Sequence, residues 1–387
     1  MPRDAEKQGI KAILGTRPRL VLGALAVVAL FAVSYILIRD RMGDANRPKI
    51  KSLAVLPLKN LSGDPSQEYL ADGMTEALIG RLAGIHDLRV VSRTSVMRFK
   101  DTSLSVPEIA KTLRVDAVVE GSVMREGTRI RVHAQLIRAA TDEHFWSETY
   151  DRDLQDVLTL ESDVAQSVAR KVEATVTGEE HARLSAARSV SPEVYENYLK
   201  GQFTLAKTNS RAGVEESIGY FEEAIKQDPT FALAYVGLAN AHSDLSTVFI
   251  GAPPAEERAK VMSEAQKALE LDPGLAEAYA LLADVYQELW RWTESEAEYR
   301  RALQLNPSDA NAHHGLAVWL LCQGRTDEAL AWAQRGRELD PIAVSGTDIA
   351  WILFHARRYD EAVRELRGVS TRPSHPRSRK GPRNCRP

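Results

Sequence analysis

The chain has few cysteines and nearly balanced charges. Two cysteines in 387 residues are too few for the disulfide framework of a small secreted domain or for a cysteine-rich zinc site. Fifty basic residues face 53 acidic ones, and the net charge of −3 gives no bulk attraction for nucleic acid. Neither a Gly-x-x-x-x-Gly-Lys-Ser/Thr loop nor a Gly-x-Gly-x-x-Gly turn occurs, so no phosphate-binding site is evident.

Signatures of catalysis are missing as well. The sequence has no His-Glu-x-x-His pair and no Gly-x-Ser-x-Gly elbow. Its densest histidine cluster is His313-His314, and neighbouring helical residues point about 100° apart, so the two do not naturally share a metal. We predict no catalytic, cofactor-binding or metal-binding residues and expect a protein that is not an enzyme. An enzyme with an unrecognised site is the weakest alternative.

A fixed period marks the C-terminal half. Leu271-Asp272-Pro273, Leu305-Asn306-Pro307 and Leu339-Asp340-Pro341 end alike and follow one another at equal intervals. The interval matches the length of one helix–turn–helix tetratricopeptide unit, about 34 residues. Small and large residues also recur where paired helices must approach and interlock. The sequence therefore resembles a tetratricopeptide array, which is a surface for binding other molecules.

The array extends beyond these three prolines. Pro229 closes an earlier unit, and the longer interval from Pro229 to Pro273 gives one unit about ten extra residues, near Gly251–Pro254. A fifth unit begins near Val344 and does not reach its closing proline. We predict four tetratricopeptide units and a partial fifth over residues 191–369.

Residues 20–38 are a long uncharged run between basic flanks. At about 1.5 Å per residue the run is just long enough for the hydrocarbon core of a membrane. The main alternative is a cleaved signal peptide with Ala32-Val33-Ser34 as its cleavage site. The apolar run continues past that site to Ile38, which favours an uncleaved membrane anchor. We predict a short basic tail at 1–19, a transmembrane helix at 20–38 and a linker at 39–49.

The orientation in the membrane is less constrained. Five basic residues lie on each side of the run, so the positive-inside rule does not decide. A short N-terminal tail is easily retained in the cytoplasm, and large domains translocate regardless of charge. Our expectation is a single-pass protein of the bacterial inner membrane, with the N-terminus cytoplasmic and the bulk periplasmic.

The region between this run and the repeats has a mixed pattern. We expect strands at 52–58, 88–91, 117–124, 129–137 and 143–150, and helices at 67–82, 106–113 and 156–176. The strands on either side of Glu126-Gly127 are expected to form a hairpin. The predicted fold class is α/β plus all-α: a transmembrane helix, a mixed-sheet α/β domain at 50–178 and a tetratricopeptide solenoid at 191–369.

Several motifs of the α/β region carry a family resemblance. They include Leu-Ala-Val-Leu-Pro-Leu at 53–58, Asn-Leu-Ser-Gly-Asp at 60–64, Glu-Tyr-Leu-Ala-Asp-Gly-Met-Thr at 68–75 and Trp-Ser-Glu-Thr-Tyr-Asp at 146–151. In combination they resemble the TolB amino-terminal-like (FlgO-like) domain. In that family the domain often precedes tetratricopeptide repeats, and the two together usually form the C-terminal half of a larger regulator. The N-terminal half of such a regulator is a CadC-like winged-helix DNA-binding domain, a nucleotide cyclase or a protein kinase.

The chain departs from that arrangement at its start. Only the segment 1–19 precedes the predicted span, and it is too short for a winged-helix, cyclase or kinase domain. The resemblance therefore does not carry over an output activity. Five acidic residues of the α/β region could form paired carboxylates, but we assign them to structure: Glu68, Asp72, Glu120, Glu148 and Asp151. Nearby Asp64 lies in a turn, and Asp72-Gly73 and Glu120-Gly121 are explained by close approaches at glycine.

In tetratricopeptide arrays the inner face of each first helix lines a groove. The alignment places seven polar residues there as candidate contacts for a partner: Asn240, Glu277, Asp284, Gln287, Glu288, Asn311 and His314. The middle unit is acidic, which favours a basic or polar peptide, and the alternative is that these side chains form a solvated face. We expect a protein or peptide partner, a membrane contact through 20–38 and no nucleic acid.

Residues 370–387 contain six basic residues, four prolines and no acid. We predict a disordered tail, favour a frameshift that truncated a longer array, and keep a basic tail that touches lipid or nucleic acid as an alternative. The predicted function is a non-catalytic, membrane-anchored interaction scaffold or signal receptor. The alternative is the sensor-half remnant of a CadC-like regulator, or of a cyclase- or kinase-linked one, without its output domain.

Overall fold

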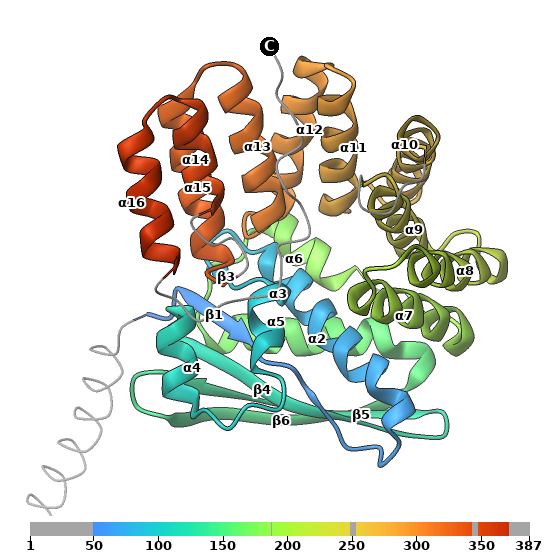
Figure 1. The fold of residues 1–387 in the computed structure, drawn as a ribbon. Helices are drawn as coiled ribbons and strands as arrows, with labels where there is room; N and C mark the ends of the chain where they lie inside the picture. Colours follow the sequence, from blue (N-terminus) through green and yellow to red (C-terminus); the bar gives the residue numbers. More distant parts are fainter. Residues whose placement is uncertain (1–48, 187, 248–252, 343–346, 371–387) are drawn as a thin grey trace, which may run out of the picture. The chain divides into compact units, whose positions relative to one another are not determined.

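The computed structural model describes residues 49–186, 188–247, 253–342 and 347–370 (Figure 1). The described residues from Ile50 onward form one compact unit. The predicted basic tail, transmembrane helix and C-terminal tail, apart from Ser370, lie outside the described residues. Within the described ranges, no helix is both long and apolar enough to cross a membrane.

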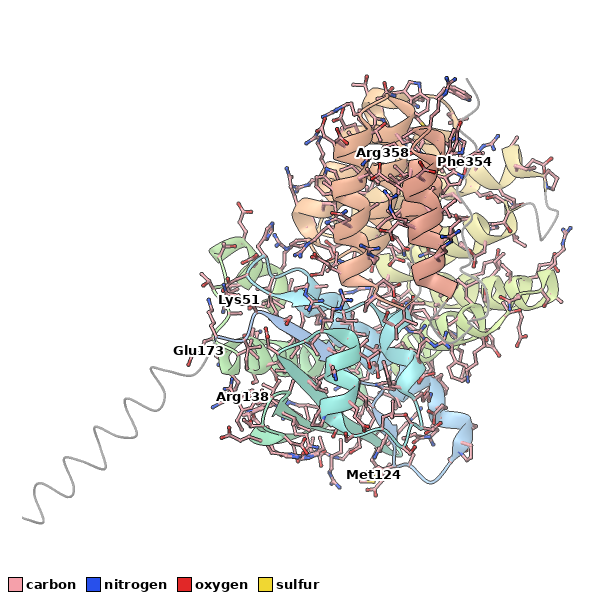
Figure 2. All side chains as sticks on the ribbon, turned by 60° about the vertical axis from the view of Figure 1, so that its left-hand side comes forward. Lys51, Met124, Arg138, Glu173, Phe354 and Arg358 are labelled. Carbon is pink, nitrogen blue, oxygen red and sulfur yellow. The ribbon has the colours of Figure 1, made fainter. Side chains whose placement is uncertain are left out.

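The first part of this unit is a mixed β-sheet with the strand order β3-β1-β4-β5-β6, in which the short β2 also pairs with β4. The pairs β1–β3, β1–β4 and β2–β4 are parallel, and β4, β5 and β6 form an antiparallel ladder. Met124 lies near the hairpin turn and Arg138 at the far end of β5 (Figure 2). The strands are β1 Ser52–Val55, β2 Lys59–Asn60, β3 Arg89–Val90, β4 Ala117–Glu126, β5 Arg129–Arg138 and β6 Glu143–Asp153.

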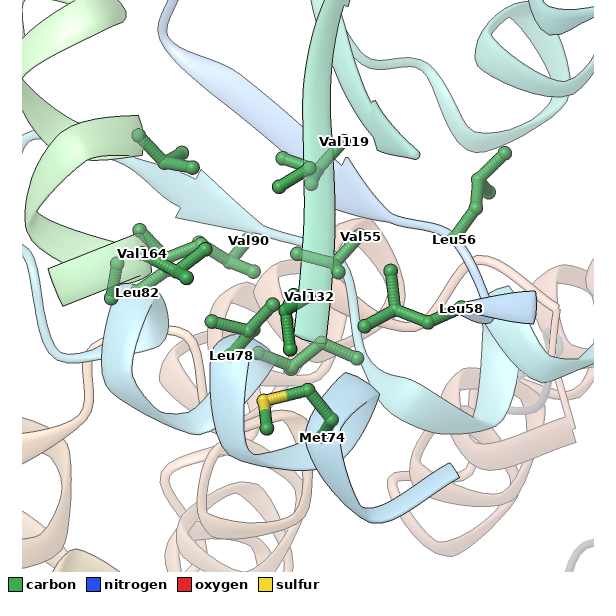
Figure 3. Packing of buried hydrophobic residues seen from close by; sticks show 14 of the residues in the cluster. Val55, Leu56, Leu58, Met74, Leu78, Leu82, Val90, Val119, Val132 and Val164 are labelled. Carbon is green, nitrogen blue, oxygen red and sulfur yellow. The ribbon is translucent and has the colours of Figure 1, made fainter. Parts of the chain in front are cut away.

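Helices α2 and α5 pack against this sheet. Met74, Leu78 and Leu82 recur every four residues of α2, so they share one helix face, and all three are fully buried against sheet residues such as Val55 and Val132 (Figure 3). The helices of this part are α2 Glu68–Ala83, α3 Arg93–Val96, α4 Val106–Leu113, α5 Val157–Lys171 and α6 Gly178–Ser185, with short 3-10 turns at Pro65–Gln67, Met97–Phe99 and Leu154–Asp156.

The sequence predicted most of these elements correctly. The hairpin and the helix at 106–113 are confirmed, and the hairpin turn places Gly127 at a positive φ of 60°. The strand predicted at 52–58 ends at Val55, because Pro57 cannot donate to a ladder, and pairing resumes at Lys59. The helix predicted at 156–176 was too long. The chain leaves it after Lys171 through a left-handed Glu173, and a capping box of Thr177 and Glu180 begins α6.

Within the described residues, ten helices form five consecutive pairs, where the sequence predicted four units and a partial fifth. The first helices of the pairs are α7 Pro192–Lys207, α9 Ala232–Leu245, α11 Ala276–Glu288, α13 Ala310–Cys322 and α15 Thr347–His355. The second helices are α8 Arg211–Gln227, α10 Pro254–Leu271, α12 Trp292–Leu305, α14 Thr326–Leu339 and α16 Tyr359–Ser370. The extra residues of the second unit lie partly between α9 and α10 and partly in α10, which has 18 residues where α12 has 14.

Each junction between units joins one large residue to one small one. Eight residues before and eight after each closing proline stand Phe221 and Gly237, Ala265 and Leu281, Tyr299 and Gly315, and Ala333 and Ile349. A Cβ atom on Gly237 would lie 2.3 Å from Phe221 Cε1, and one on Gly315 would lie 2.5 Å from the Tyr299 ring. Ala265 and Leu281 share one buried cluster, and Ala333 and Ile349 share another. At successive junctions, the large residue therefore comes alternately from the second helix of one unit and from the first helix of the next unit.

The turns that carry the closing prolines lie against the α/β part. At the first turn, Arg188 donates to Asp228 Oδ2 and Thr230 Oγ1, each at 2.9 Å. The second turn, at Gly274, lies near Arg183 of α6. At the third, Val90 N–H donates to Ser308 Oγ at 3.1 Å. One edge of the array is thus attached to the α/β part at several points along its length.

The fourth turn is completed by the α/β part itself. In the first three turns, the Asp or Asn side chain before proline accepts from the amide two residues on, as in an Asx turn: Asp228 from Thr230, Asp272 from Gly274 and Asn306 from Ser308. In the fourth, Ile342 N–H donates instead to Ser95 Oγ at 3.1 Å, and Ser95 donates to buried Asp340. Ser92 N–H also donates to Leu339 O at 2.9 Å.

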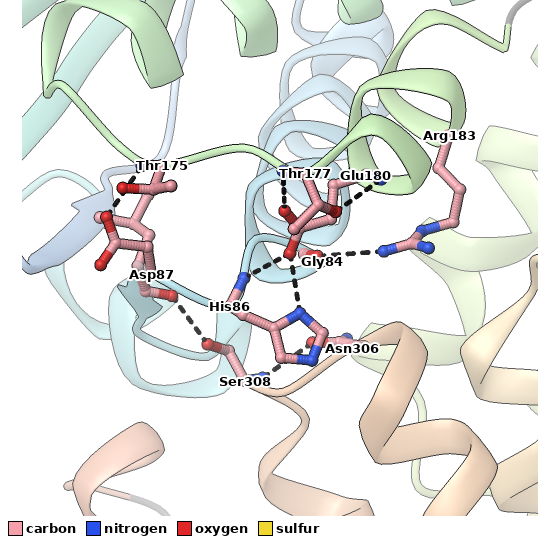
Figure 4. A network of polar contacts seen from close by, with 10 residues as sticks. Gly84, His86, Asp87, Thr175, Thr177, Glu180, Arg183, Asn306 and Ser308 are labelled. Carbon is pink, nitrogen blue, oxygen red and sulfur yellow. Dashed lines mark hydrogen bonds and ion pairs between the residues drawn. The ribbon is translucent and has the colours of Figure 1, made fainter.

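A polar network secures α6 beside the third turn (Figure 4). Glu180 Oε1 accepts from His86 N–H at 2.9 Å and contacts His86 Nδ1 at 2.7 Å, while Thr177 N–H donates to Glu180 Oε2 at 2.6 Å. Burial alone would raise the pKa of Glu180, but these hydrogen bonds lower it to about 2. Glu180 therefore stays ionised and joins α6 to the segment that leads into β3.

Candidate functional site

The first helices of the array form one layer. Helices α7, α9, α11, α13 and α15 contact one another in order, whereas each second helix mainly contacts the first helices on either side of it. The first helices therefore follow one another as a continuous layer. Polar side chains on this layer are therefore the candidates for partner binding, and the structure shows how each of the seven predicted residues is engaged.

Asn240 and Glu277 are brought together across the layer. Asn240 Nδ2 of α9 donates to Glu277 Oε1 of α11 at 2.6 Å and also to Val236 O at 3.2 Å. Glu277 is exposed and Asn240 half-buried. The amide thus holds the carboxylate in place at the surface, where it can meet a cationic or hydrogen-bonding group.

Asp284 and Gln287 share a phenol that the sequence did not indicate as part of the site. The Tyr299 hydroxyl of α12 lies 2.6 Å from Asp284 Oδ1 and 3.3 Å from Gln287 Oε1. The Tyr299 ring passes under Gly315, so its hydroxyl reaches the inner layer from a second helix. Burial and the Asp284 carboxylate hold the pKa of Tyr299 well above its usual value, so the hydroxyl remains a donor.

Glu288 of the acidic middle unit and Asn311 of the next unit differ in their surroundings. Glu288 Oε2 lies 3.3 Å from Arg258 Nη1 of α10, so its charge is balanced by a second helix of the preceding unit. Asn311, at the start of α13, is exposed. The acidity predicted for the middle unit is therefore reduced at Glu288 and is greatest at Glu277 and Asp284.

His314 faces a partner from the incomplete fifth unit. Its Nδ1 atom lies 3.5 Å from Asp348 Oδ2 of α15, and no hydrogen bond is formed by that buried nitrogen within the described residues. Burial raises the pKa of Asp348, and the nearby His314 opposes that shift. The sequence analysis missed Asp348 because the fifth unit lacks the proline that would have aligned it.

His313, the neighbour of His314, belongs to the core. Its Nδ1 lies 2.8 Å from Asp309 O, and its ring packs against Trp332 with centroids 5.2 Å apart. Burial lowers the pKa of His313 to about 4, so it is neutral near pH 7. Across the described ranges, no group of three histidine, cysteine, aspartate or glutamate side chains is arranged to hold a metal ion.

The α/β part contributes charge next to the inner layer. Burial, then the charges of Glu76 on α2 and Glu277 on α11, raise the pKa of Tyr198 on α7 well above its usual value. Glu76 Oε2 lies 3.3 Å from Arg93 Nε. The charge of Glu76 is therefore balanced by Arg93, as that of Glu288 is by Arg258.

The acidic residues of the α/β part itself are engaged in structural contacts. Lys100 Nζ lies 2.6 Å from Glu68 Oε1 and also pairs with buried Asp72. The side chains of Glu120, Glu148 and Asp151 contact Gln135, Tyr150, and the pair Arg129 and Arg131, respectively. Each of these five carboxylates therefore has a structural partner.

The two glycines beside these acids also have structural reasons. A Cβ atom on Gly73 would lie 2.5 Å from Leu199 Cδ2 of α7, and one on Gly121 would lie 2.1 Å from His133 O of β5. The close approach predicted at both positions is confirmed.

A buried acid–histidine–acid group lies between α9 and α10, away from the seven predicted residues. His242 Nδ1 is 2.6 Å from Glu257 Oε2, and His242 Nε2 is 3.4 Å from Glu264 Oε1. Burial raises the pKa of Glu264 to about 8 and lowers that of His242. His242 Nδ1 forms a hydrogen bond with Glu257, and Glu264 lies beside the other ring nitrogen.

Family comparisons match both parts of the chain. Residues 49–168 match the HilA/YgeH-like transcriptional regulator second domain, and residues 280–341 match the tetratricopeptide repeat. The chain is therefore similar to the second domain of such regulators, followed by tetratricopeptide repeats. This arrangement is consistent with the sensor half of a CadC-like protein.

Two curated proteins are similar over part of their length. A putative adenylate cyclase 3 of Rhizobium meliloti (strain 1021) is 32% identical over 250 residues, which are 64% of this chain and 42% of that protein. Anaphase-promoting complex subunit 3 of Schizosaccharomyces pombe is 29% identical over 108 residues, 28% of this chain and 16% of that protein. The chain spans less than half the length of the curated relatives it matches.

Among solved structures, a thermophilic TPR protein of Thermus thermophilus aligns with 46% of this chain and 89% of its own, at 17% identity and a TM-score of 0.39. MamA aligns with 44% of this chain and 92% of its own, at 19% identity and a TM-score of 0.33.

Proposed function

We propose that this protein is a non-catalytic, membrane-anchored interaction or signal-reception protein, whose inner helix layer binds a basic or polar peptide segment. The observation that carries the proposal is the set of carboxylates held on that layer. Asn240 orients Glu277, and the Tyr299 hydroxyl orients Asp284. Fixed carboxylates favour a cationic ligand, because orienting them costs little further entropy on binding.

The alternative proposal is the sensor half of a regulator. It is supported by the match of residues 49–168 to the second domain of HilA/YgeH-like transcriptional regulators and by the partial similarity to a putative adenylate cyclase. In this proposal the α/β part is the TolB amino-terminal-like domain suggested by its motifs, and ligand binding to it controls the activity of an output domain. The two proposals share a binding surface and differ in what the binding event controls.

Site-specific photo-cross-linking in cells tests the binding surface. A photoreactive residue at Asn311, exposed on the inner layer, is compared with one at Ala297, exposed on the second helix α12. We expect a discrete cross-linked protein from position 311 that Glu277→Lys weakens, and none from position 297. Equal cross-linking at both positions, or a product insensitive to Glu277→Lys, would refute peptide binding on this layer.

The membrane anchor and its orientation remain proposals. They are supported by the uncharged run at 20–38 and its basic flanks. A periplasm-active phosphatase fused after residue 387 leaves the compact unit uninterrupted, and we expect activity in intact bacterial cells. A second fusion at the same position carries a reporter that fluoresces only in the cytoplasm. Its fluorescence would place the binding surface in the cytoplasm and contradict the proposed orientation.

A further inference from the structure

The last helix pair exposes apolar side chains at positions that earlier units bury. Val363 of α16 is 45% exposed, whereas its equivalents one to four units earlier are all buried: Ala329, Ser295, Val261 and Ser217. Phe354 of α15 is 57% exposed, and its equivalents Leu320, Tyr286 and His242 are buried. In each earlier unit the first helix of the next unit packs beside the corresponding helix pair.

These residues belong to one surface. Phe354 and Tyr359 have ring centroids 5.6 Å apart, and Tyr359, Val363 and Leu366 follow one another along one face of α16 at helical spacing. All four side chains are exposed, and Phe354 is seen on the last helix pair in Figure 2. We call these four residues the terminal apolar patch. A contiguous apolar face on an amphipathic helix marks an interaction site.

The charges beside the patch indicate what covers it. Asp360 lies near the start of α16 and Arg367 near its end, and neither forms an ion pair within the described part of the chain. Two copies of α16 that meet antiparallel around Val363 place Asp360 of each copy opposite Arg367 of the other. A parallel arrangement would instead place like charges together. The surface is therefore complementary to itself about a two-fold axis.

The sequence that follows α16 is a poor alternative cover. Prolines occur at 373, 376 and 382, so this sequence does not have the pattern of a further array helix. We propose that the terminal apolar patch is an isologous contact through which two copies of this chain associate, with their α16 helices antiparallel. The apolar side chains supply the affinity, and the Asp360–Arg367 pairs set the orientation, because exposed ion pairs contribute little to affinity.

Sedimentation velocity of the full chain in detergent tests this proposal. We expect a concentration-dependent dimer for the native chain and a monomer for Val363→Glu, which changes an already exposed position. Leu104→Glu is the matched control, because Leu104 is 46% exposed in the α/β part, and it should leave the dimer unchanged. A native chain that stays monomeric, or a Val363→Glu dimer as stable as the native one, would overturn the proposal.

Charge exchange tests the antiparallel geometry. Asp360→Arg and Arg367→Asp should each weaken association of the variant with itself, since each places like charges opposite one another. A mixture of the two single variants should associate, because every pair across the two-fold axis is again of opposite sign. The same pairing should return in the double variant Asp360→Arg/Arg367→Asp. Association of both single variants at native strength, or failure of the mixture to associate, would exclude this arrangement.

Discussion

Exchanging the partners at the first junction between units tests whether neighbouring units fill one volume in two ways. Phe221→Ala removes a fully buried ring and should cost about 3–5 kcal/mol of unfolding free energy. Gly237→Leu places a side chain where its Cβ atom meets Phe221 at 2.3 Å. We expect a cost of about 1–3 kcal/mol from overpacking, offset by about 1 kcal/mol of helix propensity.

The double variant Phe221→Ala/Gly237→Leu recreates the Ala265–Leu281 pair of the next junction. It should be more stable than the sum of the single changes predicts, by about 2–3 kcal/mol. Recovery will be incomplete, because Gly201 of α7 also contacts the Phe221 ring, and a leucine from α9 does not restore that contact.

Urea unfolding followed by circular dichroism measures all four members of the cycle. The reverse exchange at the second junction, Ala265→Phe with Leu281→Gly, is the matched control and should show coupling of the same sign. Additive single changes at both junctions would refute the reasoning, since they would mean that the paired residues do not compete for one space.

Three further changes probe the buried polar contacts. Glu264→Gln should stabilise the protein at pH 9, by on the order of 2 kcal/mol, and much less at pH 4.5. Burial raises the folded pKa of Glu264 to about 8. The stability that the protonated Glu264 side chain contributes is therefore fully present below the unfolded pKa near 4.5 and is lost as the pH rises through 8. A Tm that shifts equally at both pH values would contradict this. Glu161→Ala should cost about 3–5 kcal/mol in urea titration, because it leaves Arg81 and Tyr195 without their shared buried carboxylate, and an effect below about 1 kcal/mol would mean that water replaces it. Ser308→Ala removes the acceptor of the buried Val90 amide and should cost about 1–3 kcal/mol, with faster hydrogen exchange at that amide; unchanged exchange would show that the contact does not hold the edge of the sheet.

Local patterns in the sequence were sufficient for the individual elements. The four-residue spacing of Met74, Leu78 and Leu82 predicted α2, and the turn at Gly127 predicted the hairpin, because both depend on neighbouring residues alone. The closing prolines predicted the first four helix pairs of the array, and the last pair was predicted as a partial fifth unit without such a proline. The extension of α5 to residue 176 failed because Val172 and Val176 continue its apolar pattern, whereas the left-handed turn at Glu173 has no sequence signal.

Contacts between distant segments could not be predicted in this way. The inner layer was found by alignment, but its internal bonds were not, since Asn240 and Glu277 are 37 residues apart and Tyr299 reaches Asp284 only through the gap left by Gly315. Likewise, nothing near Ser95 in the sequence indicates that it completes a turn 247 residues later, at Ile342. Such contacts depend on how the α/β part and the array meet.

The attachment of the proline-bearing turns changes how the array is expected to unfold. A free tetratricopeptide array is quasi-one-dimensional: each unit is stabilised by its two neighbours, and the ends fray independently. Here, the turns at Asp228, Ser308 and Ile342 also bond to the linker or to the α/β part, so units far apart along the array share a common support. Loss of one unit then weakens contacts to the α/β part as well as to its neighbours. The array and the α/β part should therefore melt together in one transition rather than unit by unit.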